Sequence, residues 1–533
     1  MRTHSLLAWM KNYPAPPRCG NEQYPLSHVP PWQPVHLIVS NRERIPISAT
    51  RLFAVIALAL TACDHPVAPR IDKPPPPQPP RVLNADVRAA ISLLENPKRN
   101  APVAVAYLVG ACRREPSVPL AGPLLYRALS DGLADGIPQV KPVTIFPHEG
   151  DVRSAVFSPD ESRVLAVADD NAAHIWEVAS GKAIGQPLKH EGRVRSAAFS
   201  PDGKRIVTGG DDRVARFWNG ATGEPEGEPL AHEGIVLCVV FSPDGSRVLT
   251  ASSDGNAQLW DAATGKAVAR PLVHGDAVLG ASFSQDGQRI LTASADWTAQ
   301  SWDAETGRRL GPPMRHTRAR VSSAHFSADG LAVVTASDDR SARIWNATTG
   351  ELIGEPLWHE RAVIGAVFNA DATRILTASL DGTARLRGTL DRDDSAIVLK
   401  HGDAVRAAIF APGERRIATA SQDHTARIWD TETGTAIGLP FSHEDSVQSI
   451  VFNKDGTRLL TTALDGTARV WDAGPREDVP AWFLEFAERF TGWKIADDGK
   501  PMHLPTREIP PLPNTREDAW TRLAARLLAP PKP

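Results

Sequence analysis

The sequence predicts an all-β protein in which one four-stranded unit is repeated and closed into a ring. Three observations lead to this fold class. A histidine recurs eight times, in steps of 42 residues with a single step of 43. In most units a Phe, a Gly-containing turn, an apolar run, a second Asp and a Trp follow that histidine in the same order. A fixed period of this length is typical of repeat architectures and not of an enzyme core.

The unit between His232 and His274 shows how each element is predicted. Residues 235–241 form an apolar run typical of a buried strand, and a Ser-Pro-Asp-Gly turn follows it. Residues 247–252 and 257–260 predict the second and third strands, separated by an Asp-Gly turn. Residues 267–272 predict a fourth strand, and Pro271 places it at the sheet edge because proline is tolerated chiefly there. One such sheet is too small to be stable alone, whereas copies arranged around an axis bury both faces.

The recurring His, Ser, Asp and Trp residues resemble the structural tetrad of WD-repeat β-propellers. The resemblance covers about 330 residues and implies a WD-repeat β-propeller that acts by binding other proteins. The best-fitting sets are His232, Ser252, Asp254 and Trp260; His274, Ser294, Asp296 and Trp302; His316, Ser337, Asp339 and Trp345; and His401, Ser421, Asp423 and Trp429.

The repeat count predicts eight blades. The last unit, which ends near Trp471, lacks a fourth strand, whereas a spare strand at residues 143–147 precedes the first unit. We expect that spare strand to complete the last sheet and to remove its open edge. The first and sixth units are the weakest, and Arg387 replaces the tryptophan of the sixth. A seven-bladed ring with one unit outside it is the alternative.

The N-terminal residues predict a secreted, lipid-anchored protein. Residues 52–60 form a short apolar segment after Arg51, and Leu60, Thr61 and Ala62 precede Cys63. This pattern is similar to a bacterial lipoprotein signal, which implies lipidation of Cys63 and a place on the periplasmic or extracellular side of a membrane. The alternatives are an ordinary buried apolar segment and, if the signal is not used, a cytoplasmic protein.

The rest of the chain predicts a linker and two helical regions. We divide the chain into a leader (1–63), a Pro-rich linker (64–81), a small helical region (82–140), the propeller (141–472) and a helical C-terminal extension (473–533). The helices are expected near residues 84–95, 102–112, 119–133, 480–492 and 515–528. We expect the aromatic C-terminal helix to pack on the propeller, because a large exposed group of aromatic side chains would promote aggregation. A helix that docks a partner is the alternative.

The sequence predicts no catalytic, cofactor or metal site. A net charge of −3 does not favour a nucleic-acid surface. The repeated histidines lack the zinc-protease spacing, and each has a structural place in its repeat. His174 and His325 are unique to their units and are expected to be packing or surface residues.

Two sets of residues are candidates for binding a partner. The second-to-third-strand loops and the fourth-to-first-strand loops share one end of the ring, and consecutive units carry unusual Trp and Arg residues there. Trp and Arg dominate interface hot spots. The predicted patch consists of Trp297, Arg318, Arg320 and Trp358. A second set, expected at the mouth of the central channel, suggests an anionic partner and consists of Arg153, Arg195 and Arg406.

The sequence thus favours a membrane-tethered, non-catalytic scaffold that binds a protein or peptide partner. A sensory or regulatory module of a signalling system is one alternative. A propeller hydrolase or lyase that uses the central channel is another.

Overall fold

The computed structural model describes most of the chain after residue 84. The described residues are 85–94, 97–114, 121–130, 140–389, 396–474, 481–491, 493–495, 501–504 and 523–524. The predicted lipoprotein signal, Cys63 and the Pro-rich linker lie outside the described residues, as does most of the predicted helix at 515–528.

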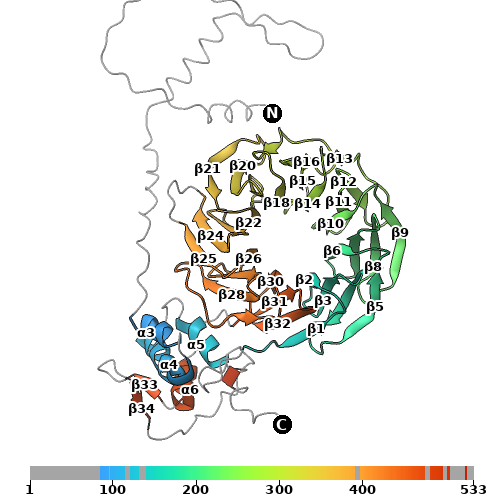
Figure 1. The fold of residues 1–533 in the computed structure, drawn as a ribbon. Helices are drawn as coiled ribbons and strands as arrows, with labels where there is room; N and C mark the ends of the chain where they lie inside the picture. Colours follow the sequence, from blue (N-terminus) through green and yellow to red (C-terminus); the bar gives the residue numbers. More distant parts are fainter. Residues whose placement is uncertain are drawn as a thin grey trace, which may run out of the picture. The chain divides into compact units, whose positions relative to one another are not determined.

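Eight four-stranded antiparallel sheets, here called blades, form a closed ring (Figure 1). Blade 1 contains β2 (Val152–Phe157), β3 (Arg163–Ala168), β4 (Ala172–Glu177) and β5 (Ala183–Lys189). Blade 2 contains β6 (Val194–Phe199), β7 (Arg205–Gly210), β8 (Val214–Asn219) and β9 (Pro225–Ala231). Blade 3 contains β10 (Val236–Phe241), β11 (Arg247–Ser252), β12 (Asn256–Asp261) and β13 (Leu272–Val273). Blade 4 contains β14 (Val278–Phe283), β15 (Arg289–Ser294), β16 (Thr298–Asp303) and β17 (Met314–Arg315).

The second half of the ring repeats this order. Blade 5 contains β18 (Val321–Phe326), β19 (Ala332–Ser337), β20 (Ser341–Asn346) and β21 (Leu352–Trp358). Blade 6 contains β22 (Val363–Phe368), β23 (Arg374–Ser379), β24 (Thr383–Gly388) and β25 (Ile397–Lys400). Blade 7 contains β26 (Val405–Phe410), β27 (Arg416–Ser421), β28 (Thr425–Asp430) and β29 (Phe441–Ser442). Blade 8 contains β30 (Val447–Phe452), β31 (Arg458–Ala463) and β32 (Thr467–Asp472).

An N-terminal strand completes blade 8. Strand β1 (Thr144–Pro147) pairs antiparallel with β32, with Thr144 opposite Val470 and Pro147 opposite Thr467. Phe146 is fully buried in this pair, whereas Ile145 is 46 % exposed. The sixth unit also forms a complete blade despite Arg387. The eight-bladed prediction is therefore confirmed, and the seven-bladed alternative is wrong.

The fourth strand of blade 3, the unit between His232 and His274, differs from the prediction. It was expected at residues 267–272, but β13 contains only Leu272 and Val273. Pro271 lies just before it, but Pro187, Pro229 and Pro356 occupy the equivalent position within seven-residue strands, so the proline does not explain the short strand. A single bridge between Trp260 and Ala267 holds the earlier part of the segment.

The described helices form a small module at the edge of blades 7 and 8. They are α3 (Ala85–Leu94), α4 (Pro97–Arg114), α5 (Ala121–Ser130) and α6 (Ala481–Thr491), accompanied by the hairpin β33 (Trp493–Ile495) and β34 (Pro501–His503). Phe483 and Phe486 of α6 are fully buried in a core that continues into blades 7 and 8. The aromatic C-terminal helix is therefore a packed element, as the first interpretation of it predicted. None of the described helices is long and apolar enough to cross a membrane.

Two residues of α5 attach this module to the propeller. Tyr126 donates its hydroxyl to Asp472 at 2.8 Å. Arg127 is 1 % exposed, and its guanidinium donates to the backbone oxygens of Asp472 and Leu439 at 3.0 and 3.2 Å. The same guanidinium lies 4.4 Å from the centre of the Phe441 ring. A buried arginine with this set of partners fixes the orientation of α5 on the blade.

Candidate interaction surface

The buried polar network of each blade fixes the loops at one end of the ring. In blade 3, His232 Nδ1 lies 3.2 Å from Asp254, and His232 Nε2 lies 2.6 Å from the hydroxyl of Thr250. The indole N–H of Trp260 donates to the same hydroxyl at 2.8 Å. This network therefore joins the fourth-to-first-strand loop, which carries the histidine, to the turn between the second and third strands, which carries the aspartate.

The same network recurs around the ring. Seven blades have the His–Asp and His–Thr contacts, and the threonines are Thr208, Thr250, Thr292, Thr335, Thr377, Thr419 and Thr461. In six of them a tryptophan donates to that threonine; the exception is blade 6, where Arg387 replaces the tryptophan.

The prediction that a serine hydroxyl completes the tetrad is wrong. The bridging residue is the threonine two positions before the serines that the sequence reading chose, which were Ser252, Ser294, Ser337 and Ser421. These serines instead hold the turn, because each accepts a hydrogen bond from the backbone N–H of the tetrad aspartate. In a strand, side chains two apart point to the same face, so spacing alone does not distinguish the two hydroxyls.

The electrostatics of the tetrads is that of a structural network. Burial lowers the pKa of His232 and of His316, so these imidazoles are neutral at pH 7. Burial raises the pKa of Asp339, but hydrogen bonds from His316 and Ser341 outweigh it and hold the pKa well below its usual value. The tetrad groups are thus engaged with one another, and no group of three His, Cys, Asp or Glu residues in the described part of the chain is placed to hold a metal ion.

Blade 1 contains a rearranged network that includes His174. Ala166 stands where the other blades have the bridging threonine, and Trp176 donates directly to His148 Nε2 at 3.1 Å. Asp170 pairs with His174 at 2.7 Å instead of with the repeat histidine. Burial, together with the nearby His174, lowers the pKa of His148 to about 4. His174 therefore belongs to a packing network, which was one of the two roles expected for it.

His325 lies on the first strand of blade 5. Its side chain is accessible to solvent, but the protein around it reduces the hydration of the charged imidazole and so lowers its pKa. The structure gives it no ion-pair or hydrogen-bond partner among the described residues.

The structure places Trp297 at a left-handed turn. Trp297 lies between β15 and β16 with a φ of 74° and is 45 % exposed. The equivalent turn residue has a positive φ in every blade, and the others are Asn171, Arg213, Gly255, Arg340, Gly382, His424 and Gly466. A bulky residue rarely adopts this conformation, because its Cβ crowds the backbone.

The other predicted patch residues lie on the same end of blades 4 and 5. The backbone N–H of His316 donates to the oxygen of Trp297, which places the loop containing Arg318 and Arg320 next to this turn. Trp358 ends β21 opposite Ser341 and is 54 % exposed. We call Trp297, Arg318, Arg320 and Trp358 the Trp–Arg patch.

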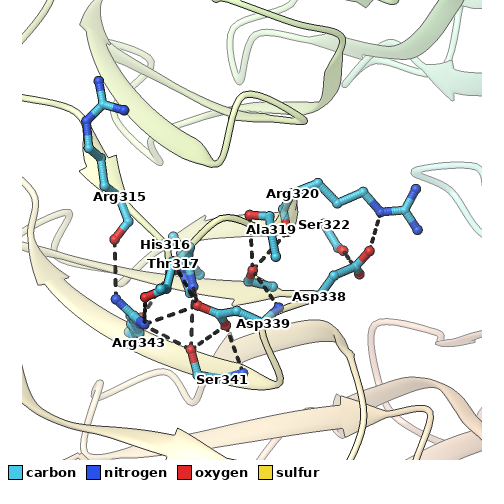
Figure 2. Close-up of polar contacts among 12 residues, drawn as sticks. Arg315, His316, Thr317, Ala319, Arg320, Ser322, Asp338, Asp339, Ser341 and Arg343 are labelled. Carbon is cyan, nitrogen blue, oxygen red and sulfur yellow. Dashed lines mark hydrogen bonds and ion pairs between the residues drawn. The ribbon is translucent and has the colours of Figure 1, made fainter.

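The two arginines of the Trp–Arg patch differ. Arg320 forms an ion pair with Asp338 at 2.6 Å, as Figure 2 shows. Arg318 has a φ of 54° and no ion pair with any described residue. Arg343 joins blades 4 and 5 below these loops, because it donates to the oxygen of Arg315, to Thr317 and to Asp339 (Figure 2). The hydrogen bonds of Arg343 therefore fix the loop that carries Arg318 and Arg320.

The three arginines expected at the channel mouth are paired. Each occupies the second position of a first strand, where the ladder with the second strand shifts register. Arg153 bonds to Asp169 at 2.6 Å and Arg195 to Asp211 at 2.6 Å. Arg406 lies 2.6 Å from the amide oxygen of Gln422 in the orientation that satisfies both groups. Two of the three charges are thus neutralised by a neighbouring carboxylate, which weakens the case for an anionic partner at this position.

A cavity of about 290 Å³ lies in blade 4, beside Trp297. It is lined by His274, Gly275, Asp296, Thr298, Gln300, Arg309, Pro313 and Arg315. This cavity was not predicted from the sequence. Its signal was present, because Gln300 stands where five other blades have arginine.

Comparison with known proteins agrees with the repeat geometry. The model of the WD domain, G-beta repeat family matches seven segments, which are residues 140–177, 182–219, 223–261, 266–303, 312–346, 395–430 and 437–472. The propeller belongs to the WD-repeat family. The longest part of the ring without a match is residues 347–394, which contains β21 and the first three strands of blade 6, yet blade 6 closes the ring like the others. WD-repeat propellers generally bind protein partners and typically act as non-catalytic scaffolds.

Solved structures support the fold alone. The WD-repeat chain is similar to the crystal structure of the computationally designed Ika8 protein, with a TM-score of 0.55 and 21 % sequence identity. The match covers 62 % of this chain and 99 % of the designed protein. No curated protein matches the sequence.

Proposed function

We propose that this WD-repeat protein is a non-catalytic scaffold that binds a protein partner through the Trp–Arg patch. The observation that carries the proposal is the strained, exposed Trp297. A non-glycine residue in the left-handed conformation costs about 1–2 kcal/mol. Four other blades also have a non-glycine residue at this turn, but among the eight turns only that of blade 4 has a tryptophan. A strained residue with a half-exposed indole supports a role in contact rather than in folding.

The charge around Trp297 supports a partner with acidic and apolar groups. Arg315, Arg318 and Arg340 lie at the same end of blades 4 and 5 as Trp297 and are exposed, and none forms an ion pair with a described residue. Trp358 adds a second exposed indole on the neighbouring blade. Aromatic and arginine side chains are enriched at the centre of protein interfaces.

Affinity purification of variants tests this proposal. Trp297→Gly removes the indole and also relieves the backbone strain of the turn, so loss of a partner would not reflect unfolding. We expect Trp297→Gly combined with Trp358→Ala to lose at least one partner that the unmodified chain captures. The matched control is His424→Gly, which makes the same turn substitution in blade 7. If the double variant retains every partner, the patch is not the binding surface.

We further propose that a lipid on Cys63 tethers the scaffold to the outer side of a membrane. The apolar segment, the Leu-Thr-Ala-Cys sequence and the proline-rich stretch of residues 74–80 support this proposal. Labelling with radioactive palmitate tests it, since Cys63→Ala should abolish incorporation. Equal labelling of both proteins would refute the anchor.

A further inference from the structure

Two residues shape the cavity in blade 4, which are Gln300, at a position where five other blades have arginine and blade 3 has Gln258, and Arg309. At the position of Gln300, blades 5, 6 and 8 have Arg343, Arg385 and Arg469, whose guanidinium groups donate to the outer strand of the preceding blade. The shorter Gln300 does not make this contact. In blade 4 the contact comes from Arg309, which donates to the oxygen of Val273 at 2.8 Å and lies 5.2 Å from the centre of the Trp302 ring. The space that the arginine fills elsewhere is therefore left as a cavity.

A buried hydrogen-bond acceptor lines this cavity. Gln300 is 1 % exposed, and its amide nitrogen donates to the oxygens of Ser301 and Gly311 at 2.9 and 3.2 Å. These two contacts fix the orientation of the amide. No described protein group donates to the remaining Oε1 atom, although buried polar atoms are nearly always hydrogen-bonded. A ligand that occupies the cavity is therefore expected to present an N–H or O–H group to it.

The residues that line the cavity carry an excess of positive charge. Arg309 and Arg315 form no ion pair with a described residue, and Figure 2 shows the Arg315 side chain extending away from the network around Arg343. Asp296 also lines the cavity, but its carboxylate already accepts hydrogen bonds from His274, Gly275 and Thr298. Burial raises the pKa of Asp296, and these hydrogen bonds outweigh it and keep the carboxylate ionised. Two cations and one anion leave a single positive charge.

We propose that this cavity binds a carboxylate-bearing segment of a partner protein. A backbone N–H of the segment donates to Gln300 Oε1, and an Asp or Glu carboxylate accepts hydrogen bonds from Arg309 and Arg315. One negative charge balances the single positive charge of the cavity, whereas a doubly charged phosphate would leave the cavity with a net negative charge. The inference rests on the proposed scaffold function and places one anchor of the partner beside Trp297.

Fluorine NMR of the full chain labelled with 5-fluorotryptophan tests the inference. The probe is N-acetylglutamate N-methylamide, and its neutral counterpart is N-acetylglutamine N-methylamide. We expect the glutamate probe to shift the resonances of Trp297 and Trp302 saturably, and the glutamine probe to bind at least fivefold more weakly. Trp297→Gly and Trp302→Phe assign the two resonances.

Variants distinguish the cavity from a general charge effect. Gln300→Leu should weaken the glutamate probe at least fivefold, whereas Gln258→Leu, the same strand position in blade 3, should leave it unchanged. Arg315→Gln changes an exposed side chain, keeps the fold and should also weaken binding at least fivefold. Equal binding of the two probes, or stronger binding of inorganic phosphate that Gln300→Leu does not affect, would overturn the inference.

Affinity purification separates this inference from the function on which it rests. If Trp297→Gly with Trp358→Ala loses a partner but Gln300→Leu and Arg315→Gln keep it at full yield, the scaffold stands and the cavity anchor is refuted. If all four substitutions leave every partner bound, the proposed function itself fails.

Discussion

At the scale of single residues, the stability of a blade such as blade 3 depends on one neutral histidine held between an acceptor and a donor. The aspartate accepts the Nδ1 proton, so Nε2 of the imidazole accepts the proton of the threonine hydroxyl. That hydroxyl oxygen then accepts the N–H of the tryptophan. Each buried polar group thereby has a partner, which is the condition for a stable polar network inside a protein.

Substitution of the two hydroxyls in blade 3 should separate their roles. Thr250→Val keeps the shape of the side chain but removes the partner of both His232 and Trp260. We expect it to lower the free energy of unfolding by about 2–3 kcal/mol. Ser252→Ala removes only a turn contact and should cost about 1 kcal/mol. Urea titrations followed by tryptophan fluorescence measure both values, and a larger loss for the serine variant would contradict the tetrad described here.

The tetrad histidines should make the propeller sensitive to acid. Burial holds the pKa of His148 near 4 and lowers the pKa of five further repeat histidines, which are His190, His232, His316, His359 and His443. Because the unfolded chain binds more protons than the folded one between pH 6.5 and the lowered values, stability must fall as the pH falls through this window. His148 alone contributes on the order of 3 kcal/mol to this change.

The melting temperature measured between pH 7.5 and pH 3 checks this expectation. We expect it to decrease steadily below pH 6.5. Below pH 3.8 a second loss should follow, because the tetrad aspartates have lowered pKa values and must then be protonated. A melting temperature that is constant from pH 7 to pH 4.5 would contradict the assignment of neutral, buried histidines.

At the scale of elements, arginine contacts join neighbouring blades. In five blades the first residue of the second strand reaches the next blade, and these residues are Arg163, Arg205, Arg247, Arg289 and Arg416. Arg247 donates to the oxygens of Ala304 and Gly287 at 2.8 and 3.1 Å. Its guanidinium also lies 5.9 Å from the centre of the Phe283 ring. A planar, forked donor of this kind fits two backbone oxygens at once.

Two other junctions use an acidic residue for the same purpose. Glu414 accepts the side-chain amide of Asn369 at 3.1 Å, which joins blades 6 and 7. Glu161 accepts that of Asn453 at 3.1 Å, which joins blades 8 and 1. The ring is therefore held by long polar side chains at one end and by the tetrads at the other.

Removal of one arginine contact should weaken the ring measurably. Arg247→Ala is expected to lower the free energy of unfolding by about 2 kcal/mol, because two backbone oxygens lose a charged donor. Arg374→Ala is the matched control, since Arg374 has the same strand position in blade 6 but is exposed and has no described partner. The control should change stability by less than about 0.5 kcal/mol. Equal effects in chemical denaturation would show that the inter-blade contact does not matter.

At the scale of the whole molecule, closure of the ring depends on a strand from the start of the propeller. Strand β1 covers the outer edge of blade 8, which would otherwise present unpaired backbone groups. The buried Phe146 lies 5.7 Å from Trp176 of blade 1, so the strand also links the first and last blades through side chains.

Two substitutions on β1 should differ sharply in effect. Phe146→Ala removes a fully buried ring at the junction and should cost about 3–5 kcal/mol. Ile145→Ala changes an exposed side chain on the same strand and should cost less than about 0.5 kcal/mol. Deletion of residues 143–147 should be worse than either substitution. Calorimetry measures these effects, and an unchanged melting temperature for the deletion would contradict closure by strand exchange.

The fold class, the first three strands of the unit between His232 and His274, the eight blades and the closing strand could all be predicted from the sequence, whereas the extent of that unit's fourth strand could not. These features depend on local chemistry that repeats, such as apolar runs, glycine at left-handed turns and proline at the edge of a sheet. The exposed Trp297 and Trp358 could also be chosen from the sequence, because a residue that departs from a repeat is visible without coordinates.

The tertiary structure alone decided which side chains meet. It showed that Thr250 and not Ser252 completes the tetrad, because only the hydroxyl of Thr250 lies within hydrogen-bond distance of both His232 and Trp260. It paired Arg153 and Arg195 with carboxylates in the turns that follow the second strands of their blades, and it placed the cavity beside Gln300 in blade 4. The physical reason is that the repeat pattern fixes the positions of strands and turns, whereas contacts between side chains on different strands depend on distances that no local pattern in the sequence records.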